Sequence, residues 1–153
     1  MRIYRIVQNI ILIMLLMVII SLGVLICIFN IRPLIVISGS MEPAIMTGSL
    51  CFVNYNDRDV DVGDIIAYRA GDKTVTHRVI DRSADGYVTK GDGNNAADVS
   101  PVTEDRIIGT DIFNIPKLGY AIMALKSAKG IMITLVLFTG YFLAGIFIER
   151  RVK

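Results

Sequence analysis

The sequence predicts a mainly β protein, in which a compact antiparallel β domain is flanked by two transmembrane helices. Hydrophobic residues make up 54% of the 153 residues and the mean hydropathy is positive, which is too apolar for a soluble domain of this size. The apolar residues concentrate in two uncharged stretches, residues 10–29 and 130–148. Short β-branched runs separated by turn residues fill the chain between them.

The first stretch, residues 10–29, is long enough as a helix to cross the roughly 30 Å hydrocarbon core of a bilayer. A cleaved signal peptide is the competing interpretation, because Arg2 and Arg5 precede the stretch. The stretch is longer than the usual apolar region of such a peptide, and the sequence ICIFNIRP at its end contains no small-x-small cleavage site. We therefore predict an uncleaved membrane anchor.

Residues 30–116 are predicted to form one β domain. Turn-forming Gly, Asp and Asn residues bound each apolar run at a spacing that favours antiparallel strands over βαβ units. The expected strands are residues 34–38, 50–55, 64–69, 74–80 and 86–91. Residues 81–92 loosely imitate a calcium-binding loop, but strand-like runs flank them instead of helices, so we expect a hairpin turn there and no metal.

The end of the chain is predicted to return to the membrane. A last strand and a turn at Pro116 lead into residues 117–129, which we interpret as an interfacial segment with Tyr120 and the lysines at headgroup level. Ordinary core residues with a solvated face are the alternative for the first half of this region. Residues 130–148 form the second predicted transmembrane helix.

Charge predicts the orientation. Lys and Arg residues flank both apolar stretches at the chain ends, so residues 1–9 and 149–153 are expected to be cytoplasmic. Residues 31–116 contain eight Lys or Arg and thirteen Asp or Glu residues, a net charge of −5. The domain is therefore expected outside the cytoplasm, and it lacks the basic surface that nucleic-acid binding requires.

A candidate nucleophile lies about ten residues after the first apolar stretch, in the sequence Ser38-Gly39-Ser40-Met41-Glu42-Pro43. A serine hydroxyl needs a base to attack a carbonyl, and near neutral pH this base is most often histidine. His77 is the only histidine of the chain, and strand alternation places it on one face of its strand. Ser40 and His77 together therefore favour nucleophilic catalysis over an ordinary loop serine and a structural histidine.

A neutral imidazole acting as a base is usually oriented by a carboxylate. The sequence KGDGNNAAD offers two, Asp92 and Asp98. Each also has a purely structural interpretation, Asp92 as a turn former between two glycines and Asp98 as a solvated loop charge. Spacing alone leaves the choice open, and no residue pattern predicts a cofactor or a metal site.

Four short motifs, SGSMEP, GDIIAYR, VTHRV and TKGD, follow the anchor in this order and together resemble the type I signal peptidases, peptidase family S26. The resemblance covers roughly residues 31–120. Most bacterial members have a lysine where VTHRV has His77, so the chain resembles the endoplasmic-reticulum-type Ser-His branch, which includes the SipW-like enzymes. The Gly-Asp-Asn turn of the family reads Gly-Asp-Gly-Asn here.

The resemblance implies a signal peptidase-like β catalytic domain and a membrane-bound serine endopeptidase, signal peptidase I. It implies Ser40 as nucleophile, His77 as general base and Asp98 as the carboxylate partner, with Asp92 as second choice and Ser38 in the oxyanion hole. The implied substrates are signal peptides of secretory preproteins, and the implied partners are the lipid bilayer and the protein-export translocon. The implied location is the plasma membrane, multi-pass with the catalytic domain outside, or the endoplasmic reticulum membrane in a eukaryote.

Two other functions fit parts of the sequence. A non-catalytic membrane-anchored adaptor would use the β domain for binding and SGSMEP as a simple turn. A self-cleaving repressor peptidase would share a related β fold, but it predicts a lysine base and a DNA-binding domain, neither of which matches this chain.

Overall fold

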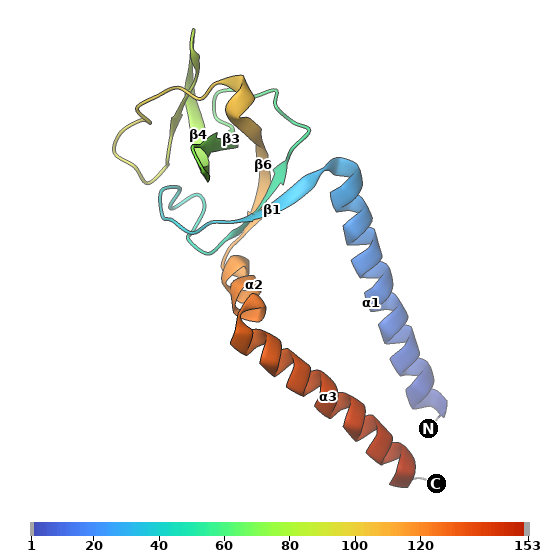
Figure 1. The fold of residues 1–153 in the computed structure, drawn as a ribbon. Helices are drawn as coiled ribbons and strands as arrows, with labels where there is room; N and C mark the ends of the chain where they lie inside the picture. The colour runs from blue at the N-terminus through green and yellow to red at the C-terminus, as the bar shows by residue number, and fades with distance from the viewer. Residues whose placement is uncertain (1, 152–153) are drawn as a thin grey trace.

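The computed structural model describes residues 2–151; Met1 and residues 152–153, at the ends of the two predicted cytoplasmic tails, lie outside the described residues. Helix α1 (Arg2–Phe29) precedes the β domain, and helices α2 (Leu118–Lys126) and α3 (Ala128–Arg151) follow it. All three helices lie on one side of the domain, and α1 and α3 extend away from it (Figure 1).

The domain is built on one six-stranded antiparallel sheet, which confirms the predicted fold class. The strands are β1 (Ile31–Ile35), β2 (Leu50–Asn54), β3 (Ile65–Ala70), β4 (Lys73–Ser83), β5 (Gly86–Lys90) and β6 (Ile107–Ile115), in the order β1-β2-β6-β3-β4-β5. A short 3-10 turn, η1 (Glu104–Arg106), leads into β6. Because β6 lies between β2 and β3, the last strand joins the β1–β2 pair to the β3–β4–β5 meander.

Two groups of buried side chains form the core. The larger group packs residues of β3, β4, β5 and β6 with two loop valines: Val60, Ile66, Tyr68, Val79, Tyr87, Val102 and Ile107. The smaller group contains Met41, Ile45 and Cys51, which places the segment after Ser40 against β2. Ser40 is thus anchored through the residues that follow it.

The first strand begins three residues earlier than expected. We predicted residues 34–38, whereas β1 spans Ile31–Ile35 and includes Pro33. Proline lacks an N–H and is tolerated in a sheet mainly on edge strands, and β1 is an edge strand. Residues 36–38 therefore leave the sheet and lead to Ser40.

Residues 117–129, predicted as an interfacial segment, contain helix α2 and the break before α3. Gly119 of α2 packs closely against the domain, because a Cβ there would lie 2.7 Å from the carbonyl oxygen of Gly48 and 2.8 Å from Ile35. The backbone N–H of Ser127 closes α2 by donating to the carbonyl of Met123 at 3.0 Å. The chain therefore passes from β6 through the short helix α2, which packs against the domain, into α3.

Among the described residues, two helices are long and apolar enough to cross a membrane, over the ranges Ile6–Phe29 and Ala128–Gly145, and the domain buries neither of them. They diverge toward the domain (Figure 1). Near the chain ends, the side-chain amide of Gln8 donates a hydrogen bond to the hydroxyl of Tyr141 at 2.5 Å. The membrane crossing and its orientation stay predictions.

Candidate active site

Ser40 lies in a tight turn between β1 and β2. The backbone N–H of Glu42 donates to the carbonyl of Gly39 at 3.0 Å, and the buried side chain of Met41 anchors the turn in the smaller core group. The Glu42 carboxylate accepts hydrogen bonds from the hydroxyl (2.7 Å) and backbone N–H (3.1 Å) of Thr47, and these bonds lower the pKa of Glu42. The turn is therefore held at both ends, and the Ser40 hydroxyl has a fixed location.

His77 lies in the middle of β4 opposite Ile66 of β3, and only 7% of its surface is exposed. The Nε2 atom of His77 is 3.1 Å from Oγ of Ser40, within hydrogen-bond distance. A strand position is rigid, so the imidazole meets the hydroxyl from a fixed side. The structure thus brings together the predicted nucleophile and the predicted base.

Asp98 completes the arrangement from the loop after β5. Its Oδ2 atom lies 2.7 Å from Nδ1 of His77 and also accepts hydrogen bonds from the hydroxyls of Tyr68 (2.8 Å) and Thr89 (2.5 Å). Burial acts to raise the pKa of Asp98, but the hydrogen bonds from His77, Thr89 and Tyr68 outweigh it and lower the pKa. An ionised Asp98 holds the proton on Nδ1, which leaves Nε2 free to accept from Ser40.

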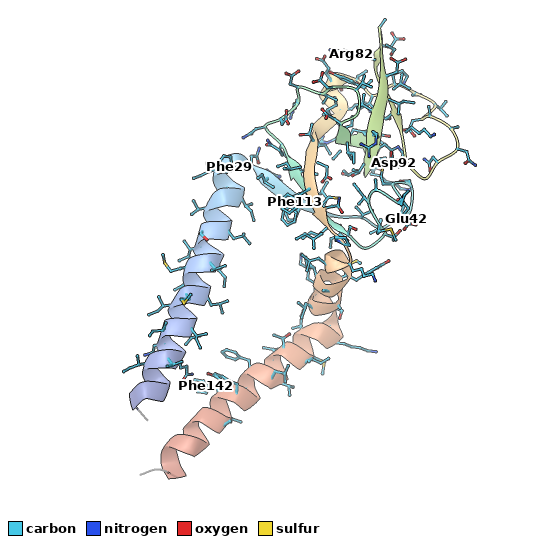
Figure 2. All side chains as sticks on the ribbon, turned by 180° about the vertical axis from the view of Figure 1, so that it is seen from behind. Phe29, Glu42, Arg82, Asp92, Phe113 and Phe142 are labelled. Atoms are coloured by element: carbon cyan, nitrogen blue, oxygen red, sulfur yellow. The ribbon has the colours of Figure 1, made fainter. Side chains whose placement is uncertain are left out.

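Asp92 pairs with Arg78 instead of His77. Nε of Arg78 donates to Oδ1 of Asp92 at 2.9 Å, and Nη2 donates to Oδ2 at 2.7 Å. Neighbouring residues of a strand point to opposite faces, so Arg78 and His77 draw the two aspartates to opposite sides of β4. Figure 2 shows Asp92 on the same flank of the domain as Glu42, away from α1.

The loop that carries both aspartates packs directly on the serine turn. The backbone N–H of Gly93 donates to the carbonyl of Ser40 at 2.8 Å. A Cβ added at Gly91 would lie 2.4 Å from the same carbonyl oxygen and 3.0 Å from Nε2 of His77, so only glycine fits without a shift. The two glycines therefore set the approach of His77 to Ser40.

Ser38, the predicted oxyanion donor, is exposed, and its Oγ lies 3.5 Å from Oγ of Ser40. A hydroxyl at this distance from the nucleophile can turn toward an oxygen bound beside it. The five predicted site residues thus fall into a connected group of Ser40, His77, Asp98 and Ser38, with Asp92 in a separate ion pair nearby.

Comparison with known proteins gives the family. The family model described as signal peptidase, peptidase S26, matches residues 7–111, which is more than half of the chain. The chain belongs to the signal peptidase family S26. The match includes most of α1 and the five predicted site residues.

Several curated signal peptidases are similar to this member of the family. The signal peptidase complex catalytic subunit SEC11 of Zygosaccharomyces rouxii is 36% identical over 123 residues, covering 69% of this chain and 72% of that protein. Signal peptidase I W of Bacillus subtilis is 40% identical over 79 residues, covering 47% and 42%. SEC11 of Eremothecium gossypii is 38% identical over 101 residues, covering 56% and 60%. The aligned part is thus less than half of the bacterial relative.

Sequence reasoning missed three polar residues around this signal peptidase site: Tyr68, Thr89 and Arg78. One signal could have found Tyr68. The two-residue turn between β3 and β4 fixes their register, which pairs Tyr68 with Val75 and puts Tyr68 on the same face as His77. The partners of Thr89 and Arg78 depend on the path of the loop after β5, which no local pattern predicts.

Proposed function

We propose that this chain is a membrane-bound serine endopeptidase that removes signal peptides from exported preproteins. The observation that carries the proposal is the continuous hydrogen-bonded series from Ser40 through His77 to Asp98, with distances of 3.1 and 2.7 Å. This is the arrangement that a nucleophile, a base and an orienting carboxylate require. A packing role for these residues would not call for such a series at an accessible turn.

In the proposed reaction, Oγ of Ser40 attacks the scissile carbonyl carbon while Nε2 of His77 takes the hydroxyl proton. The same proton passes to the leaving amine as the C–N bond breaks, which leaves an acyl ester on Ser40. His77 then takes a proton from water while the water oxygen attacks the acyl carbon. The bond from this carbon to Oγ of Ser40 breaks, His77 returns the proton to Oγ, and the new carboxylate leaves. The backbone N–H of Ser40 and the hydroxyl of Ser38 stabilise the oxyanion, each worth roughly 3 kcal/mol.

The substrate is proposed to bind as an extended strand. β1 is an edge strand whose outer side is free of other described strands, and it leads to Ser40 within five residues. A peptide added to this edge would run toward the nucleophile, with main-chain hydrogen bonds supplying affinity. Shallow pockets near Ser40 would then select small residues.

The domain is proposed to act at the outer surface of the bilayer. Phe113 of β6 stacks on Phe52 with ring centroids 4.5 Å apart, and 48% of Phe113 is exposed. It lies at the end of the domain from which the helices leave (Figure 2). An aromatic pair with an exposed Phe113 ring beside two apolar helices supports contact with lipid, where a signal sequence emerges from the translocon.

The test is cleavage of a purified preprotein in detergent by the wild type and by the Ser40→Ala and His77→Ala variants. We expect a defined cleavage in the wild type and a loss of at least 1,000-fold in each variant, because residues of a triad act as a unit. Near-normal turnover in either variant would refute the mechanism, and no cleavage by the wild type would favour the adaptor alternative.

A further inference from the structure

Asp98 receives its hydrogen bonds in an unusual pattern, because three neighbouring strands each supply one donor to the same oxygen. Tyr68 comes from β3, His77 from β4 and Thr89 from β5, and all three reach Oδ2 within 2.8 Å. In addition, the backbone N–H of Asp98 donates to the carbonyl of Thr89 at 2.8 Å. The carboxylate thus sits on the sheet, although its backbone belongs to an irregular loop.

The two hydroxyl donors are enclosed. Thr89 is fully buried, and only 5% of Tyr68 is exposed, so water has little access to either hydroxyl. Burial raises the pKa of Tyr68 to about 12, and the phenol therefore remains a donor throughout the working pH range. No hydrogen bond joins either hydroxyl to Ser40. Thr89 acts on the reaction through Asp98, and Tyr68 acts through Asp98 and through its longer contact with Nδ1 of His77 at 3.5 Å.

A carboxylate on a loop can rotate, and an imidazole follows the carboxylate that holds its Nδ1 proton. With His77 as its only partner, Oδ2 would be free to swing with the ring, and the 3.1 Å approach of Nε2 to Ser40 would be lost in part of the population. Two additional donors from flanking strands fix Oδ2 at a single point. The imidazole is then held at Nδ1 by Asp98, and its Nε2 atom is directed at Oγ of Ser40.

We propose that Tyr68 and Thr89 are positioning residues, whose hydroxyls fix Asp98 so that His77 is held with Nε2 directed at Ser40. The inference rests on the proposed function and extends it from three residues to five. The energetic basis is geometric, because a misplacement of about 1 Å at a reacting group can cost about 100-fold in rate.

The experiment compares Tyr68→Phe and Thr89→Val, which remove one hydroxyl each and preserve shape. Each is expected to lower kcat for preprotein cleavage about tenfold with KM unchanged, since no substrate contact is lost. Thr89→Ser, which keeps the hydroxyl, is expected to recover most of the loss. A purely structural role would not produce a kcat effect that a serine hydroxyl restores.

Matched controls are available in the same domain. Tyr87→Phe removes the hydroxyl of a buried tyrosine in the same core group as Tyr68, and Thr110→Val removes the hydroxyl of a buried threonine that donates to Asp57 at 2.7 Å. Both are expected to keep the wild-type kcat. Equal losses in these controls, or a wild-type kcat in the Tyr68→Phe, Thr89→Val double variant, would overturn the inference.

A second measurement separates this inference from the proposed function. The rate at which a serine-directed acylating probe modifies Ser40 depends on the orientation of His77 but not on preprotein recognition. One outcome is that the wild type cleaves no preprotein while the probe reacts more slowly with Tyr68→Phe and Thr89→Val than with the wild type. This result would support the positioning role and refute the proposed substrate. A probe rate equal in all variants would overturn the positioning role, whatever the preprotein result.

Discussion

Gly91→Ala tests directly how the site is held together. The new Cβ would lie 2.4 Å from the carbonyl oxygen of Ser40 and 3.0 Å from Nε2 of His77, whereas ordinary van der Waals contact begins near 3.4 Å. Gly91 does not adopt a left-handed backbone conformation, so alanine adds no backbone strain there. The neighbours must therefore move by about 1 Å, and the motion separates the nucleophile from its base.

A displacement of about 1 Å between reacting groups costs about 100-fold in rate, or about 2.7 kcal/mol of transition-state stabilisation. We expect kcat for preprotein cleavage in detergent to fall by this factor in Gly91→Ala. Gly109→Ala is the matched control, because its Cβ would meet the carbonyl oxygen of Asn54 at 2.1 Å, away from the site. Activity per folded molecule should be retained in the control. Near-wild-type kcat in Gly91→Ala would refute the argument that this contact sets the geometry.

Three further predictions concern the carboxylates and the oxyanion. Asp98→Asn is expected to lower kcat by about 10⁴-fold, because asparagine holds the histidine of a Ser-His-Asp triad in the wrong tautomer. Asp92→Asn should lower kcat less than tenfold and lower the free energy of unfolding by about 1 kcal/mol, because it weakens the pair with Arg78. Kinetics and thermal unfolding distinguish the two variants, and equal kcat losses would contradict the prediction. Burial raises the pKa of Asp111 to about 6, so the folded protein binds this proton more tightly than the unfolded chain and loses stability as the pH rises from about 4 to 6. Asp111→Asn should therefore raise the unfolding free energy at pH 7 by about 1 kcal/mol after allowance for partial exposure, and a lower unfolding temperature would contradict this. Ser38→Ala should lower kcat 10- to 100-fold at unchanged KM, and a change in KM alone would argue against an oxyanion role.

Much of the sheet could be predicted because its signals are local. Gly71 and Asp72 form a two-residue turn that fixes the β3–β4 register, and Ala84 and Asp85 separate β4 from β5 as expected. The start of β1 was misplaced because Pro33 resembles a strand breaker. Only the edge location of β1, a property of the whole sheet, makes this proline acceptable.

The choice between the two aspartates could not be made from the sequence. Asp92 and Asp98 lie six residues apart in one irregular loop, and their partners, Arg78 and His77, are neighbours on β4 that point to opposite faces. Which aspartate meets which partner depends on the side of β4 on which each part of the loop lies. Tyr68 was missed for a different reason, because it lies in a strand whose other residues are mostly apolar, although the β3–β4 register places it on the same face as His77.

The central claim is that Ser40 is a nucleophile activated by His77, and labelling of Ser40 tests it most directly. The intact protein in detergent is treated with a serine-directed acylating probe, and the modified residue is located by peptide mass spectrometry. We predict a single adduct on Ser40, formed at least 100-fold more slowly in His77→Ala and absent in Ser40→Ala. An adduct on another residue, or equal labelling rates with and without the imidazole, would contradict the claim.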